Sequence, residues 1–235
     1  MKKKRYFEFI IVVLFVLSVS MLFLFENEKV LHTTSDISGL KTVVLDAGHG
    51  GEDGGAVGID GILEKEINLD ITKKLEMLLN LFGINTKMTR SEDVSLFDSA
   101  GGTVSSRKVA DIKSRVNMVN KTPDAILISI HQNSFPQENC KGSQVFYSGG
   151  NINSKILASH IQESLRFGID SKNRRKEKIN DKSIYLLENV SCPAVLVECG
   201  FLTNPQEAQL LRKDTYKTKL AVCITAGLVR YQEEK

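Results

Sequence analysis

Tryptophan is absent from this 235-residue chain and only four prolines occur, and neither scarcity decides a function. The four cysteines, Cys140, Cys192, Cys199 and Cys223, include no CxxC pair. A zinc ribbon and a thioredoxin motif are therefore not indicated. Three of the four lie in apolar stretches, so we expect small buried hydrophobic side chains there, although spacing alone cannot exclude a disulfide.

An excess of basic charge is also missing from most of the chain. The net charge is +3, but four basic residues and only one acidic residue fall within residues 1–25. The rest of the chain carries equal numbers of basic and acidic side chains. Nucleic-acid-binding domains concentrate a basic excess on the folded part, so we expect no nucleic acid partner.

A long apolar run, residues 9–25, follows the basic cluster Lys2 to Arg5 and is interrupted only by Ser18 and Ser20. It fits a short membrane anchor, near the lower limit of about 17 residues for a spanning helix. It also fits a cleaved signal peptide with a poor cleavage site. We favour the anchor. Both alternatives export the remaining chain, either membrane-anchored or secreted, because positive residues stay inside.

The sequence therefore divides into residues 1–25 as anchor or signal peptide, a polar linker at 26–40 and a folded domain at 41–235. In the domain, strand-like and helix-like segments alternate without a repeat. Strands are predicted at 42–46, 85–89, 125–130, 143–147 and within 193–198, and helices at 64–82, 108–120, 154–167, 205–211 and 215–231. This alternation predicts a single α/β domain, with a mostly parallel twisted sheet flanked by helices.

Two segments lack a regular pattern. Residues 91–106 are rich in Ser, Asp and Gly and are predicted to form a long surface loop, which is often functional or mobile. Residues 170–181 are strongly charged and are predicted to be exposed.

The stretch VVLDAGHGGEDGGAVG, residues 43–58, places Asp46 and His49 in a glycine-rich turn after a predicted strand. Such a turn could cradle a phosphate or build a metal site. The glycines match neither GxGxxG nor GxxxxGK[ST], and Glu52 and Asp53 would repel phosphate. We therefore expect the glycines to let the backbone turn sharply around the His49 ring. Asp46 either orients that ring or has a structural role at the strand end.

Other reactive side chains follow the predicted strands. His131 and Glu198 end two apolar runs, and Glu64 begins the helix after the first strand. Since sites in α/β sheets gather beyond the carboxyl ends of strands, these groups should meet His49 at one edge. Two imidazoles and one carboxylate suit a catalytic Zn²⁺ ion with an open position for water. Singly, each residue has an ordinary structural explanation. Together they predict His49, Glu64 and His131 as metal ligands, with Glu198 free to move protons.

Four ordered motifs resemble the type-3 catalytic domain of zinc-dependent N-acetylmuramoyl-L-alanine amidases: LDAGHGGEDGGAVG, EKEINL at 64–69, SIHQN at 129–133 and ECGFLTN at 198–204. The resemblance covers about residues 41–232. It implies that zinc-activated water cleaves the amide between N-acetylmuramic acid and the L-alanine of the peptidoglycan stem peptide. It assigns the zinc to the positions of His49, Glu64 and His131, and catalysis to that of Glu198. Asn68 and Asn133, within these motifs, are candidates for contacting substrate or supporting the ligands. Gln132 departs from the family, whose members often have a small residue there. We expect its side chain to face away from His131, with contact to substrate as the alternative.

The short architecture is most similar to that of the germination-specific amidases of the spore cortex, which remove stem peptides so that muramic-δ-lactam can form. A vegetative cell-wall amidase is the alternative, and a non-catalytic peptidoglycan-binding module is a weaker one. No wall-binding repeat is visible in the sequence. The domain would then reach peptidoglycan through its membrane segment or an exported protein partner.

Overall fold

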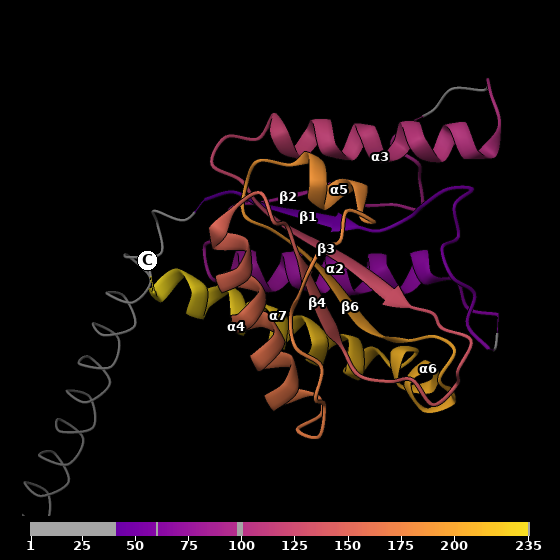
Figure 1. Cartoon of the computed structure of the whole chain (residues 1–235), viewed down its shortest axis with the longest axis vertical. Helices are drawn as coiled ribbons and strands as arrows, with labels where there is room; N and C mark the ends of the chain where they lie inside the picture. The colour runs from indigo at the N-terminus through magenta and orange to yellow at the C-terminus, as the bar shows by residue number, and fades with distance from the viewer. Residues whose placement is uncertain (1–40, 60, 98–100, 235) are drawn as a thin grey trace, which may run out of the picture. The chain divides into compact units, whose positions relative to one another are not determined.

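The computed structural model describes residues 41–59, 61–97 and 101–234 (Figure 1). The predicted anchor or signal peptide at 1–25 and the linker at 26–40 lie outside the described residues. Within the described residues, no helix combines the length and the apolar character that crossing a bilayer would require.

The described strands form one six-stranded sheet in the order β2-β1-β3-β6-β4-β5. Strands β2, β1, β3 and β6 are mutually parallel, whereas β4 runs antiparallel to β6 and β5 is parallel to β4. This confirms the predicted α/β fold with a mostly parallel sheet. The strand bounds are β1 Val43–Ala47, β2 Thr86–Met88, β3 Ile126–Asn133, β4 Gln144–Tyr147, β5 Lys178–Ile179 and β6 Ala194–Phe201.

Helices flank both faces of the sheet. Their bounds are α2 Glu64–Leu81, α3 Val104–Asn120, α4 Ile152–Gly168, α5 Tyr185–Asn189, α6 Pro205–Leu211 and α7 Asp214–Glu233. Figure 1 shows α3 and α5 together on one side of β1, with α2 and α7 beside each other on the other side, where α7 also packs against α4. Every residue of β1 is buried, as expected for a strand covered on both faces.

The face of the sheet under α3 and α5 holds one hydrophobic cluster. Val44 of β1, Leu127 of β3 and Leu196 of β6 pack there with Val119 of α3 and Leu187 of α5. Side chains alternate between the faces of a strand. Asp46 of β1, His131 of β3 and Glu198 of β6 therefore point to the same face as the cluster. They lie beyond it, where the strands end.

Several predicted details differ from the structure. Helix α3 starts at Val104, four residues before the predicted position, because Thr103 caps it by accepting a hydrogen bond from the Ser106 amide. Helix α2 ends at Leu81, one residue before the predicted end, and Phe82 is 43% exposed. The segment 170–181 is mostly exposed, as predicted, and this includes both residues of β5, but Asn173 and Asn180 within it are buried.

All four cysteines are free. Cys199 and Cys223 are buried, as expected for small hydrophobic residues, while Cys140 and Cys192 are half-buried. Neither β5 nor α5 was predicted, because two residues and five residues are too short to produce a periodic pattern.

Candidate metal centre

Strand register brings the candidate residues into two neighbouring rows at the carboxyl end of the sheet. His131 of β3 lies opposite Glu198 of β6, and Asp46 of β1 lies opposite Ser129 of β3. On the far side of β6, Gln144 is the antiparallel partner of Glu198. Because directly paired residues point to the same face, His131, Glu198 and Gln144 lie side by side.

His49 follows β1 in the glycine turn and has a positive φ of 63°. Residues other than glycine rarely adopt this backbone conformation. The glycines around it leave space for the site. A Cβ atom at Gly48 would overlap three atoms of the His131 ring. At Gly55, with φ of 69°, a Cβ atom would lie 2.6 Å from Oε2 of Glu64 and 2.7 Å from Cδ2 of His49. This explains the density of glycine in the turn.

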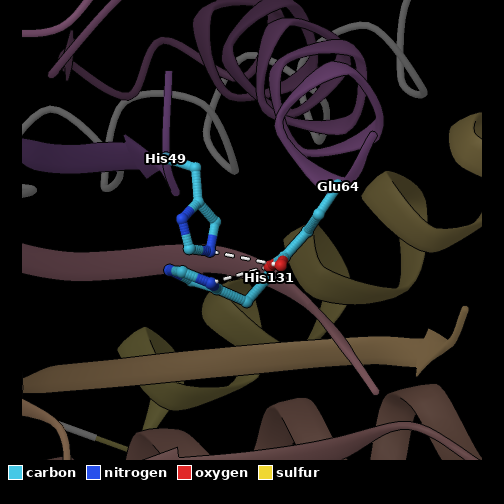
Figure 2. Close-up of side chains that lie close together, drawn as sticks. All are labelled: His49, Glu64 and His131. Atoms are coloured by element: carbon cyan, nitrogen blue, oxygen red, sulfur yellow. Dashed lines mark hydrogen bonds and ion pairs between the residues drawn. The ribbon is translucent and has the colours of Figure 1, made fainter. Parts of the chain in front are cut away.

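The turn, α2 and β3 bring His49, Glu64 and His131 together, as Figure 2 shows. Nε2 of His49 lies 3.2 Å from Oε2 of Glu64, and Nδ1 of His131 lies 2.9 Å from Oε1. The two rings meet edge to face with centroids 4.9 Å apart. One ligand atom from each residue lies within 4.8 Å of the other two. Two imidazole nitrogens and one carboxylate oxygen match the donor set of a catalytic zinc site.

Glu64 occupies the first position of α2, where the helix dipole favours a negative charge. Its side chain is nearly buried and accepts hydrogen bonds from the backbone amides of Ala56 at 2.8 Å and Gln132 at 3.0 Å. Burial alone would raise the pKa of Glu64, but His131 and His49 outweigh it and hold the pKa well below the usual range. The carboxylate is thus fixed in its ionised form.

Asn68 lies one turn after Glu64 on α2 and is fully buried. Its Nδ2 donates to the Gly48 carbonyl at 3.2 Å and to Oε1 of Glu64 at 3.3 Å. Nε2 of Gln132 donates to Oδ1 of Asn68 at 3.1 Å. Asn68 therefore supports a candidate ligand, and Gln132, which is buried behind it, is turned away from any substrate.

Asp46 does not contact the His49 ring. Its oxygens instead accept hydrogen bonds from Thr89, Ser129 and Arg115, at 2.8, 2.6 and 2.6 Å. Burial would raise the pKa of Asp46, but Arg115 and Ser129 outweigh it and lower the pKa to about 2. Of the two roles considered for Asp46, these contacts support the structural one.

The side chain beside the His49 ring is Asp53, whose Oδ2 lies 2.8 Å from Nδ1 of His49. Oδ1 of Asp53 pairs with Nζ of Lys108 at 2.7 Å. Sequence reasoning missed this role, although an acidic residue four positions after His49 in a tight turn was a usable signal.

Two buried arginines hold the carbonyl groups of the same turn. Arg90 donates to the carbonyls of Ala47 at 2.8 Å and Gly48 at 3.0 Å. Arg115 of α3 donates to the carbonyls of Ala47 at 2.8 Å and His49 at 2.7 Å. The sequence offered no signal for either arginine, because their partners lie far away along the chain. Together with Asp46, they fix the backbone that carries His49.

Glu198 stands beside the three candidate ligands. Burial raises the pKa of its carboxyl group to about 7. Its Oε2 is buried and has no hydrogen-bond partner among the described residues. A carboxyl group that is half ionised near neutral pH can both accept and return a proton.

Asn133, at the end of β3, is half-buried, and its side chain makes no hydrogen bond within the described part of the chain. It therefore stays a candidate substrate contact.

The chain is similar to known proteins over most of the described residues. The family model described as N-acetylmuramoyl-L-alanine amidase matches residues 43–230. The germination-specific N-acetylmuramoyl-L-alanine amidase of Bacillus subtilis is 39% identical over 195 residues, which cover 83% of this chain and 81% of that protein. The amidase LytC of the same organism is 33% identical over 81% of this chain but only 35% of its own length. The structure of the CwlD amidase of Clostridioides difficile, in complex with the GerS lipoprotein, superposes with a TM-score of 0.81 at 39% identity, covering 83% of this chain and all of that one.

Proposed function

Because the chain belongs to the N-acetylmuramoyl-L-alanine amidase family, we propose that it hydrolyses the amide joining N-acetylmuramic acid to the L-alanine of peptidoglycan stem peptides. The observation that carries this proposal is the convergence of His49, Glu64 and His131, with ligand atoms within 4.8 Å of one another. Glu198, the register partner of His131, provides the group that moves protons.

In this proposal, Nε2 of His49, a carboxylate oxygen of Glu64 and a ring nitrogen of His131 hold one Zn²⁺ ion. When bound, zinc lowers the pKa of water and polarises a carbonyl group. Asp53 keeps a proton on Nδ1 of His49, so that Nε2 presents its lone pair.

Glu198 performs the proton transfers. In its ionised form it accepts a proton from the attacking water and then delivers that proton to the nitrogen of the leaving L-alanine. The raised pKa of about 7 suits both steps, because the group is poised between its two forms near neutral pH. The leaving peptide must therefore begin close to Glu198.

Residues 41–235 form the catalytic domain in this proposal. Residues 1–25, with a basic cluster followed by 17 residues of mainly apolar character, hold it at the outer side of the membrane facing the wall or the cortex. The sequence identity to the germination-specific amidase, 39%, is higher than the 33% to LytC. This difference favours a role in the spore cortex, where stem peptides are removed before muramic-δ-lactam forms, over a vegetative role.

We also propose that an exported protein partner assists this chain. The related CwlD amidase was solved in complex with a lipoprotein, which supports an extracytoplasmic partner for this chain as well.

The test is metal analysis of the purified chain, followed by mass spectrometry of peptidoglycan after digestion. The expected result is about one zinc ion per chain, free stem peptides beginning with L-alanine, and glycan strands without peptides. A protein that binds peptidoglycan without zinc and releases no peptide would instead be a non-catalytic binding module.

A further inference from the structure

The row of side chains that contains Glu198 continues beyond it, away from His131. Gln144 of β4 lies directly opposite Glu198, and its side chain is tied to the segment before β5. Oε1 of Gln144 accepts a hydrogen bond from Nη1 of Arg175 at 3.0 Å, and Nε2 donates to the Lys176 carbonyl at 3.0 Å. Arg175 thus stands at the end of the row.

Arg175 is held in one orientation. Its Nε donates to the Lys141 carbonyl at 2.9 Å, and its guanidinium carbon lies 4.7 Å from the centre of the Phe201 ring. Yet no carboxylate among the described residues lies within ion-pair distance of it, and its Nη2 donates to no acceptor among them. A planar guanidinium fixed on an aromatic ring, with donors to spare, is prepared for a carboxylate from outside.

Groups of both signs lie near Arg175. The Glu207 carboxylate is close enough to interact with Arg175, but its oxygens accept hydrogen bonds from the backbone amides of Phe201 and Gly142. Lys178 of β5 lies over the Phe146 ring at 5.8 Å, on the same face of the sheet as Gln144. Its ion pair with Asp181 is long, at 3.9 Å, and both side chains are more than half exposed. Arg175 and Lys178 therefore both offer a positive charge at the edge of the sheet beyond Glu198.

The proposed reaction determines which part of the substrate lies there. Glu198 must reach the nitrogen of the leaving L-alanine, so the peptide extends from Glu198 away from the metal ligands, over Gln144. Neighbouring strands are about 4.8 Å apart, and an extended peptide advances about 3.5 Å per residue. The second residue of a stem peptide is D-glutamate, which carries a free α-carboxylate, and it comes within reach of the Arg175 side chain.

We propose that Arg175 binds the α-carboxylate of the second residue of the stem peptide and makes the enzyme selective for substrates in which this group is not amidated. The inference rests on the proposed amidase function. Arg175 touches the leaving peptide and not the reacting atoms, so it determines substrate binding more than the rate of the bond-breaking step.

The experiment compares two soluble muropeptides that differ only at the second residue, one with the free carboxylate and one with its carboxamide. The parent chain should cleave the free acid with a KM about 10- to 100-fold lower, as expected for a charge-assisted pair. Arg175→Gln should remove this difference by raising KM for the free acid alone, with kcat within about threefold of the parent. Arg175→Lys should restore part of it.

Arg166→Gln is the matched control. Arg166 is an arginine of α4 with a side chain 48% exposed and a weak pair to Glu163 at 3.7 Å, so this variant should behave like the parent. Zinc content and thermal unfolding are measured for each protein. If the parent prefers neither substrate, or Arg175→Gln lowers cleavage of both equally, the carboxylate subsite is wrong while the amidase function stands. If the parent releases no peptide from either, the proposed function fails and the subsite with it.

Discussion

Nδ1 of His49 lies 2.8 Å from Oδ2 of Asp53, and Oδ1 of the same carboxyl group lies 2.7 Å from Nζ of Lys108. Burial would raise the pKa of Asp53, but His49 and Lys108 outweigh it and hold the pKa well below the usual range. An ionised carboxylate can only accept hydrogen bonds. Asp53 therefore keeps the proton of His49 on Nδ1 and turns Nε2 toward Glu64.

Asp53→Ala should weaken zinc binding by about 10- to 100-fold, as is usual when the hydrogen-bond partner of a metal-bound histidine is removed. The measurement is zinc titration against a competing chelator. Glu52→Ala is the matched control, because Glu52 is the adjacent acidic residue and pairs with Arg107 at the surface rather than with His49. Equal zinc affinity for Asp53→Ala and the parent would show that Asp53 does not orient His49.

Gly48→Ala tests whether the metal centre needs the space beside His131. The added Cβ atom would overlap the His131 ring, so the ring must move away from Glu64. We expect loss of zinc binding together with activity, at a melting temperature close to that of the parent. Gly101→Ala adds the same methyl group where nothing lies within 4 Å, and should keep both. Full zinc occupancy in Gly48→Ala would mean that His131 is not a ligand in the orientation described.

Asp46 links stability to pH. Its pKa is lowered from 3.8 to about 2 in the folded chain, so its ion pair with Arg115 stabilises the fold fully above pH 3.8. This stabilisation is lost as the pH falls through about 2. Asp46→Asn removes one of the two carboxylates paired with the buried Arg115, Asp111 being the other. Its cost at pH 7 should therefore stay below the about 3–5 kcal/mol expected when a buried charge loses its only partner.

Urea unfolding at pH 7, 5 and 3 measures this effect. The difference between Asp46→Asn and the parent should shrink toward pH 3, since Asp46 begins to take up protons in the unfolded chain first. Asp214→Asn, which removes an exposed carboxylate paired with Lys74, should leave stability nearly unchanged. A constant difference at all three values would assign the loss to packing rather than to charge.

Some residues of the site could be predicted from the local sequence and others could not. His131 and Glu198 could be placed because each ends an apolar run, and parallel strands deliver their carboxyl ends to one edge. The direction of β4 was not predictable in this way, so Gln144 and Arg175 entered only with the antiparallel register.

The two arginines that bind the carbonyl groups of the glycine turn could not be predicted, for a different reason. Arg115 donates to Asp46 across 69 residues and Arg90 to Gly48 across 42. The residues next to each arginine in the sequence do not show whether its side chain is buried or exposed to solvent. Asp53 does carry a local signal, because it is an acidic residue four positions after His49, but its charge in the sequence indicates only that phosphate would be repelled. Contacts between side chains distant in sequence arise from tertiary packing, which periodicity does not encode.

Glu198→Gln separates proton transfer from metal binding. The amide has nearly the shape of the carboxyl group but cannot take a proton from water, so kcat should fall by at least about 100-fold. Zinc content should be unchanged, because the candidate ligands are His49, Glu64 and His131. Glu163→Gln, at an exposed position of α4, is the control and should cleave like the parent. Loss of zinc together with activity would make Glu198 a ligand, whereas cleavage at the parental rate would remove it from the reaction and leave the buried Oε2, with its pKa near 7, without a catalytic role.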